Sequence, residues 1–180
     1  MERKKLMITL NTVRELAEDA HSGQADKLGD PYIWHVRDVA AGLRPLGLHL
    51  EMAGWLHDII EDTGWTGERL LAIGVPDPVV RTVVAVTNEP GETYQEKIEK
   101  ITSSEDATLV KIADNAHNTR PDRMARLSRD VHGRLAKKYS KAQKTLWAAA
   151  DPTATRQILE SVNPDLITSF HQWLWKRLPG

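Results

Sequence analysis

The chain has 180 residues, and its 24 Lys and Arg against 25 Asp and Glu give a formal net charge of −1. Binding to nucleic acid requires a strongly basic surface, so this balance argues against a nucleic-acid partner. The chain contains no cysteine, which excludes disulfides and thiolate metal sites and leaves nitrogen and oxygen atoms as metal ligands. We find neither a signal peptide nor an apolar run of the ~20 residues that a membrane span needs, and we therefore expect a cytoplasmic protein without a membrane partner.

The first predicted elements are two helices joined by a loop. Apolar residues recur at intervals of three and four over 13–20, which predicts a helix that ends near His21. A glycine-rich loop over 23–29 carries Lys27, and the next helix carries His35. A lone histidine on a helix is more often a core or surface residue than a metal ligand, so His35 needs partners elsewhere in the chain.

The segment WLHDIIEDTG lies on a helix that we expect to run through 50–62. One side of this helix is apolar and predicts core packing. Another side carries one histidine and three carboxylates, namely His57, Asp58, Glu61 and Asp62. Such a face is typical either of a solvated helix surface or of a site that binds a metal ion and transfers protons.

A capping box over 93–96 predicts a further helix start, after a loop over 88–93. The later helix in LVKIADNAHNTR places Lys111, Asp114 and Asn118 on one face. A carboxylate between a lysine and an amide suits a metal ligand beside an anion pocket. A solvated helix face would show the same pattern, so both interpretations stay open at this point.

The C-terminal segment, about 153–180, is expected to extend a core that spans about 8–150, within one domain covering 1–180. Near its end lie Trp173, Leu174 and Trp175, with Phe170 one turn before them. These aromatic residues either pack onto the core of the same chain or form a surface for self-association in a possible homodimer. Strand-like alternation is scarce along the chain, so the sequence predicts an all-α fold of roughly eight to ten helices.

His35, the adjacent His57 and Asp58, and Asp114 together resemble the signature of the HD phosphohydrolase superfamily. Three segments are similar to motifs in the hydrolase domain of the RelA/SpoT alarmone enzymes and their small stand-alone relatives, namely AHSGQADKLGDPYIWH, WLHDIIEDTG and VKIADNAHNTR. The resemblance covers about 12–145. It implies the helical bundle of an HD domain.

The resemblance also implies a role for each matching residue. One divalent metal ion, Mn²⁺ in the family, would be held by His35, His57, Asp58 and Asp114. Glu61 and Asp62 would be the catalytic acidic pair near the attacking water. The residues expected to face the nucleotide or its phosphates are Lys27, Asn118, Lys111 and Tyr139.

Three residues next to these motifs are expected to act indirectly. We expect Tyr32 to pack beside the site and His21 to be structural, at the start of the loop. His117 is a candidate to support one of the metal ligands from behind.

The implied reaction is metal-dependent removal of pyrophosphate from the 3′ position of the guanosine alarmones (p)ppGpp, which leaves GDP or GTP. One departure from the family pattern is Asp26, which stands where the family usually has a basic residue. An acidic side chain would repel a highly anionic substrate unless it points away from it. The sequence therefore leaves two alternatives open: hydrolysis of another nucleotide, such as a 5′-nucleotide or a nucleoside di- or triphosphate, and a regulator that binds a nucleotide without turnover.

Overall fold

The structure is a computed structural model that describes residues 8–177. Within these residues it holds twelve α-helices and two 3₁₀-helices, and a single antiparallel bridge between Ala25 and Pro31 is the extent of β-structure. The first six α-helices are α1 (Leu10–Ala20), α2 (Tyr32–Leu43), α3 (Leu48–Leu56), α4 (Ile59–Asp62), α5 (Gly67–Ala72) and α6 (Asp77–Val86). The other six are α7 (Tyr94–Ile101), α8 (Glu105–Asn118), α9 (Pro121–Met124), α10 (Arg129–Ala149), α11 (Pro152–Val162) and α12 (Ile167–Trp175). The predicted all-α fold is confirmed.

The local signals in the sequence explain several helix ends. The Thr93 hydroxyl accepts a hydrogen bond from the backbone N–H of Glu96, and the Glu96 side chain accepts one from the Thr93 N–H, which is the predicted capping box. α1 ends at Ala20, with His21 as its C-cap. The predicted loop over 88–93 joins α6 to α7.

The prediction of one continuous helix over 50–62 is wrong. α3 ends at Leu56, and a turn at His57 and Asp58 separates it from the four-residue helix α4. Asp58 is the N-cap residue of α4, and its carbonyl accepts a hydrogen bond of 2.9 Å from the Asp62 N–H. Because apolar residues keep their helical spacing on both sides of the turn, the sequence pattern does not reveal it.

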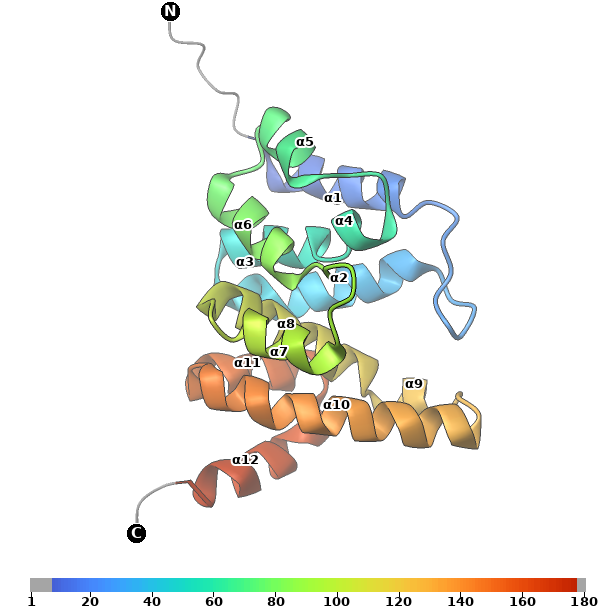
Figure 1. Ribbon diagram of the computed structural model, residues 1–180, viewed down its shortest axis with the longest axis vertical. Coiled ribbons are helices and arrows are strands. Elements are labelled where there is room, and N and C mark those ends of the chain that lie inside the picture. Colours follow the sequence, from blue (N-terminus) through green and yellow to red (C-terminus); the bar gives the residue numbers. More distant parts are fainter. Residues whose placement is uncertain (1–7, 178–180) are drawn as a thin grey trace, which may run out of the picture.

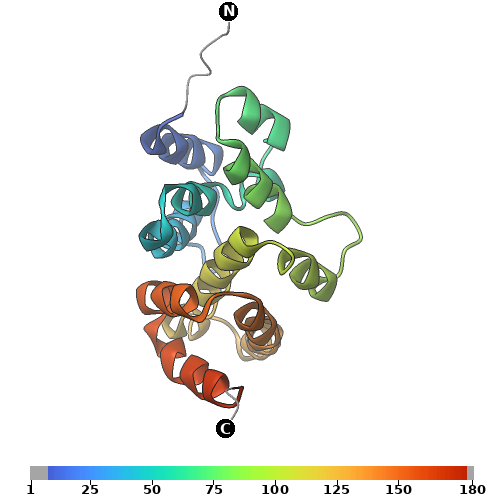
Figure 2. The same ribbon diagram turned by 90° about the vertical axis from the view of Figure 1, so that its left-hand side faces the viewer.

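The helices are stacked along the long axis of the molecule (Figure 1). α1 and α5 lie near the N-terminal end, and α10, α11 and α12 lie at the other end. α2 lies in the middle, in contact with α3, α8 and α11, and α8 contacts α10 and α11 as well. The view turned by 90° shows the same order of helices (Figure 2). None of the helices within residues 8–177 is both long and apolar enough to cross a membrane.

One hydrophobic core cluster extends from Val13 in α1 to Phe170 in α12. In α11, Ile158 and Leu159 are fully buried. The Phe170 ring packs edge-on against Trp147 of α10, with 5.3 Å between the ring centroids. The helices after α10 therefore contribute side chains to the same core as α2 and α8.

Gly54 allows α2 and α3 to pack closely, and this contact sets the distance between His35 and His57. A Cβ atom at Gly54 would lie 2.7 Å from the Cα atom of Ala40 and 2.9 Å from Cδ1 of Leu43, both in α2. We expect Gly54→Ala to push the two helices apart and to lower the free energy of unfolding by about 1–3 kcal/mol, as other overpacked cores do.

Thermal denaturation followed by circular dichroism measures this effect. The matched control is Gly133→Ala in α10, because a Cβ atom at Gly133 meets nothing within 4 Å. This control should stabilise the protein by about 0.5–1 kcal/mol, since alanine loses less conformational entropy in a helix than glycine. A Gly54→Ala protein that melts at the wild-type temperature would contradict the close-packing argument.

Candidate active site

Two histidines and two carboxylates converge where α2, α8 and the α3–α4 turn meet. The Nε2 atoms of His35 and His57 are 3.2 Å apart, and Asp58 Oδ2 lies 2.9 Å from the Nε2 atom of His57. Asp114 Oδ1 lies 3.4 Å from the Nε2 atom of His35. One ligand atom from each of His35, His57 and Asp58 lies within 4.8 Å of the others, so this group could hold a metal ion.

Hydrogen bonds behind the histidines orient their rings. The Nδ1 atom of His57 lies 2.8 Å from the carbonyl oxygen of Gly54, which can only accept, so in the neutral ring Nδ1 carries the hydrogen and Nε2 is left to bind a cation. The Nδ1 atom of His35 lies 2.7 Å from Nδ1 of His117. His117 Nε2 in turn lies 3.4 Å from Asp38 Oδ2. His117 therefore stands behind His35, where it supports the ring in the way that residues behind metal ligands do.

The electrostatics of this cluster favour a cation at its centre. Burial alone lowers the pKa of His35, but the hydrogen bonds and charges of Asp114 and Asp58 outweigh it and raise the pKa to about 9. Burial raises the pKa of Asp58, yet the charges of His57 and His35 hold it well below its usual range. The Nε2 atoms of both histidines and oxygen atoms of two carboxylates thus face one centre. A divalent ion in that position fits this set of donors, because imidazole and carboxylate groups suit borderline metals.

Asp114 is flanked on α8 by two of the residues that the sequence predicts to face the substrate. Lys111 Nζ lies 2.6 Å from Asp114 Oδ2, and Asn118 Nδ2 donates to Oδ1 at 2.5 Å. The positive charge of Lys111 keeps the pKa of Asp114 low in spite of burial, which alone would raise it. Lys111 and Asn118 therefore fix the Asp114 carboxylate as well as lining the site.

Glu61 is held firmly by neighbours that lie far away in the sequence. Its carboxylate accepts hydrogen bonds from the backbone N–H of Asn88 at 3.2 Å and from Asn88 Nδ2 at 2.5 Å. The Nζ atom of Lys97, a residue of α7 that is only 5% exposed, lies 3.1 Å from Oε2 of Glu61. Burial, the charge of Asp58 and the charge of Glu61 raise the pKa of Asp62. The two acidic residues thus differ, because Glu61 is fixed by its partners while the pKa of Asp62 is raised above its ordinary value.

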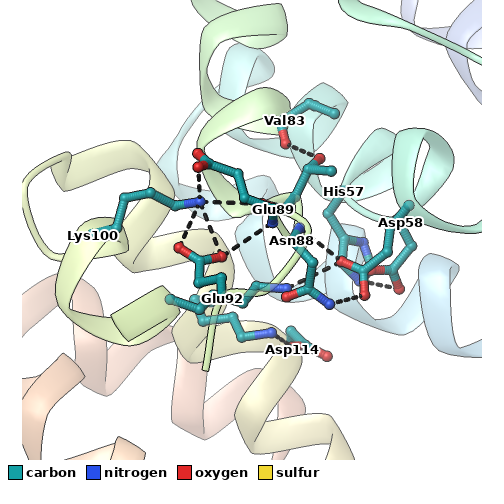
Figure 3. Close-up of polar contacts among 12 residues, drawn as sticks. His57, Asp58, Val83, Asn88, Glu89, Glu92, Lys100 and Asp114 are labelled. Carbon is teal, nitrogen blue, oxygen red and sulfur yellow. Dashed lines mark hydrogen bonds and ion pairs between the residues drawn. The ribbon is translucent and has the colours of Figure 1, made fainter. Parts of the chain in front are cut away.

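The loop that presents Asn88 is itself tied down (Figure 3). Lys100 Nζ lies 3.1 Å from Glu89 Oε1 and 3.0 Å from Glu92 Oε1, and it also donates to the Thr87 carbonyl at 3.4 Å. Figure 3 shows these two carboxylates gathered around the Lys100 ammonium group. Asn88 extends from the same loop to donate to the Glu61 carboxylate. These contacts hold the loop over 88–93, from which Asn88 donates to Glu61.

The histidine and carboxylate cluster and the acidic pair lie at one pocket of about 400 Å³. Of the ten residues that the sequence predicts for the site, nine line this pocket, and the tenth, His57, is buried behind Asp58. Tyr32 does more than the predicted packing, because its hydroxyl donates a hydrogen bond of 2.6 Å to Asp58 Oδ2. His21 is bonded through Nδ1 to Gln24 Oε1 at 2.8 Å, and Gln24 Nε2 donates to the Asp62 carbonyl at 3.1 Å.

Several residues of this pocket were not predicted from the sequence, among them Asn88, Tyr94, Lys97, Arg123 and Lys138. Lys138 Nζ lies 4.0 Å from the centroid of the Tyr94 ring, which joins α10 to α7 across the pocket. A lysine directly after a capping box is ordinarily solvated, so nothing in the sequence indicated that Lys97 would be buried at the site. Only the packing of α7 against the site buries it.

Comparison with known proteins agrees first on the class of fold. A solved structure described as a metazoan ortholog of SpoT that hydrolyzes ppGpp and plays a role in starvation responses matches with a TM-score of 0.62 and 22% identity. The match covers 93% of this chain and 94% of that chain. At this identity the likeness establishes the fold alone, which is all-α in agreement with the helices described above.

Relatives found by sequence similarity are enzymes that make or hydrolyse guanosine alarmones, according to their names. The chain is 34% identical over 134 residues to a probable GTP pyrophosphokinase of Mycobacterium leprae, which covers 65% of this chain and 17% of the relative. It is 32% identical over 134 residues to a guanosine-3′,5′-bis(diphosphate) 3′-pyrophosphohydrolase of Haemophilus influenzae, which covers 64% of this chain and 20% of the relative. It is 33% identical over 135 residues to the bifunctional (p)ppGpp synthase/hydrolase SpoT of Escherichia coli K12, covering 64% of this chain and 19% of the relative.

The chain spans about a fifth of the length of these curated relatives. No protein-family model matches it. The resemblance to RelA/SpoT alarmone enzymes that the motifs predict is confirmed by these relatives.

Proposed function

We propose that this chain is a metal-dependent phosphohydrolase that removes the 3′-pyrophosphate of (p)ppGpp and gives GDP or GTP plus pyrophosphate. The observation that carries the proposal is the pocket of about 400 Å³, in which the His–Asp cluster, the acidic pair and several cationic side chains face one space. The names of the curated relatives point to the same substrate class.

We assign the metal to His35, His57, Asp58 and Asp114, with Mn²⁺ as the expected ion. A divalent ion held there would acidify a bound water molecule and polarise a phosphoryl oxygen. The support for the assignment is the inward-facing Nε2 lone pair of His57 and the cation-stabilising field at Nε2 of His35.

The acidic pair would handle the protons of the reaction. Asp62, whose pKa is raised by burial and by the charge of Asp58, can accept a proton from the attacking water and deliver it to the leaving oxygen. Glu61, fixed by Asn88 and Lys97, would orient the water and keep its charge next to the site. Both residues act on the reacting atoms in this proposal, with Asp62 as the group that carries the proton.

The substrate would be held by charge and by stacking. Lys27, Asn118 and Tyr139 line the pocket and would contact the nucleotide, while Lys111 adds positive charge beside Asp114. Phosphoryl transfer depends mainly on positioning and on neutralising charge, which is what such side chains provide.

Three further expectations stay proposals. We treat 8–150 and the helices after 153 as one domain, because they share a core cluster. A cytoplasmic location is expected from the sequence. A homodimer through the end of α12, where Trp175 is 75% exposed, is tested by light scattering of the intact chain.

A panel of nucleotides incubated with the Mn²⁺-loaded protein, with every product identified by chromatography, tests the proposed function. We expect GDP and pyrophosphate from ppGpp, and GTP and pyrophosphate from pppGpp. Orthophosphate released from 5′-GMP or GTP would favour the alternative phosphohydrolase. Nucleotide binding without any product would favour the non-catalytic regulator.

A further inference from the structure

Asp26, the acidic residue at a position where the RelA/SpoT pattern is basic, is not free to meet the substrate. Its Oδ1 atom accepts backbone N–H bonds from Leu28 at 2.8 Å and from Asp30 at 3.0 Å. Its Oδ2 atom accepts a hydrogen bond of 2.8 Å from Arg123 Nη2. The Asp26 side chain is only 7% exposed, and both of its carboxylate oxygens already accept hydrogen bonds from the loop backbone or from Arg123.

Arg123 brings a positive charge into the pocket from α9. It lines the same space as Lys27 and Asp58, and its side chain is 18% exposed. Among residues 8–177 its one side-chain hydrogen bond is the Nη2 contact with Asp26, so its Nε and Nη1 groups have no acceptor from that part of the chain. A guanidinium group has five N–H donors in a planar fork that matches the oxygen atoms of a phosphate group.

The neighbouring arginine is used differently. Arg126 gives both of its Nη atoms to the Asp30 carboxylate and a further bond to the Leu28 carbonyl, and it lies outside the pocket lining. Both arginines thus connect the same two segments, α9 with its following turn and the loop over 23–31. Of the two, only Arg123 lines the pocket and keeps N–H groups that have no acceptor among residues 8–177.

We infer that Arg123 binds a phosphoryl group of the nucleotide and that Asp26 is the positioning residue that holds Arg123 for this contact. This inference rests on the proposed function in one respect, namely that the pocket takes a nucleoside polyphosphate. Asp26 therefore does not repel the substrate. It directs one edge of the guanidinium and leaves the other N–H groups for the anion.

The test compares Arg123→Met with its matched control Arg126→Met in the full-length, Mn²⁺-loaded protein. Two readouts are used: kcat and KM for ppGpp, and the equilibrium Kd for GTP, which needs no turnover. Loss of one charge-assisted contact should raise KM and Kd about ten- to a hundredfold in Arg123→Met, with kcat within about twofold. Arg126→Met should leave both constants within about threefold, since it removes an ion pair on the exposed side of the loop.

Asp26→Asn gives the sharpest separation, because it keeps an oxygen atom for the Leu28 and Asp30 N–H groups and removes the negative charge. A positioning role predicts a KM raised about three- to tenfold, and no further rise when Asp26→Asn is added to Arg123→Met. A lowered KM in Asp26→Asn would instead mean that Asp26 repels the substrate, and it would overturn its positioning role.

The outcomes also separate this inference from the proposed function. Hydrolysis of ppGpp by the wild type with an unchanged KM and Kd in Arg123→Met would overturn the inference and leave the function standing. A wild type that does not hydrolyse ppGpp, but whose Kd for GTP rises in Arg123→Met, would overturn the function and keep the Arg123 site. A wild type that binds neither probe would overturn both.

Discussion

Replacing His57 or Asp58 with alanine is expected to remove both the bound metal and the activity, whereas Glu61→Gln and Asp62→Asn should keep the metal and lose turnover. The basis is the position of each group. His57 Nε2 and Asp58 Oδ2 are 2.9 Å apart and both belong to the group that could hold an ion. Glu61 is engaged instead by Asn88 and Lys97, away from that centre.

The first pair of variants is expected to lose the metal ion, and the second pair is expected to lose turnover alone. Without His57 or Asp58 the cluster loses a ligand in a buried site, so metal content should fall to background and the melting temperature should lose its dependence on Mn²⁺. Both Glu61→Gln and Asp62→Asn keep the shape of the side chain. The first removes the charge proposed to orient the water, and the second removes the group proposed to carry the proton. A loss of general acid–base catalysis lowers kcat by about 10²–10⁴.

Metal analysis of the purified variants, in parallel with the product assay, measures both effects on one set of samples. Glu99→Gln is the control, because Glu99 lies on the exposed side of α7 and its carboxylate meets Gln95 and not the pocket. Full turnover in both Glu61→Gln and Asp62→Asn would reduce the acidic pair to a solvated helix face. Metal retained in both His57→Ala and Asp58→Ala would move the metal site elsewhere.

The residues that the structure brings together could be predicted from the sequence because they lie in short motifs. His57, Asp58, Glu61 and Asp62 fall within six residues, and the α8 residues fall within one helical face. The all-α fold followed from the spacing of apolar residues, and the start of α7 from its capping box.

The interruption between α3 and α4 could not be predicted in this way. It decides how closely His57 and Asp58 approach His35. A straight helix would spread His57 and Asp58 around its surface. The turn lets both side chains approach His35, at 3.2 Å and 3.5 Å from its Nε2 atom. Tertiary contacts with α2 decide this local backbone conformation, and helical periodicity carries no information about them.

The residues that bind Glu61 and Asp26 could not be predicted for a related reason. Lys97 is 36 residues from Glu61, and Arg123 is 97 residues from Asp26. Each of these cations lies in a stretch that reads as an ordinary solvated helix or loop. The charge of Asp26, which in the sequence argued against an anionic substrate, is balanced by a residue that only the fold brings near it.

Removing the chain after Ala150 is expected to unfold the protein, because α11 is part of its core. Ile158 and Leu159 are fully buried, and the Asn163 side chain donates a hydrogen bond of 2.9 Å to the Ala116 carbonyl in α8. Loss of a single buried leucine or isoleucine side chain costs about 2–5 kcal/mol, and the whole stability of a domain is about 5–15 kcal/mol. The deletion removes at least two such side chains together with Phe170, which is 1% exposed.

Two single substitutions make this prediction quantitative where the truncated chain gives only aggregates. Leu159→Ala should lower the free energy of unfolding in urea by about 2–5 kcal/mol. Trp175→Ala should change it by less than about 0.5 kcal/mol, because Trp175 is 75% exposed. A truncated chain that melts cooperatively and is monomeric, derived from a dimeric full-length protein, would refute core packing of the C-terminal helices. It would make them a surface for self-association, and Trp175→Ala would then weaken the dimer while leaving the monomer folded.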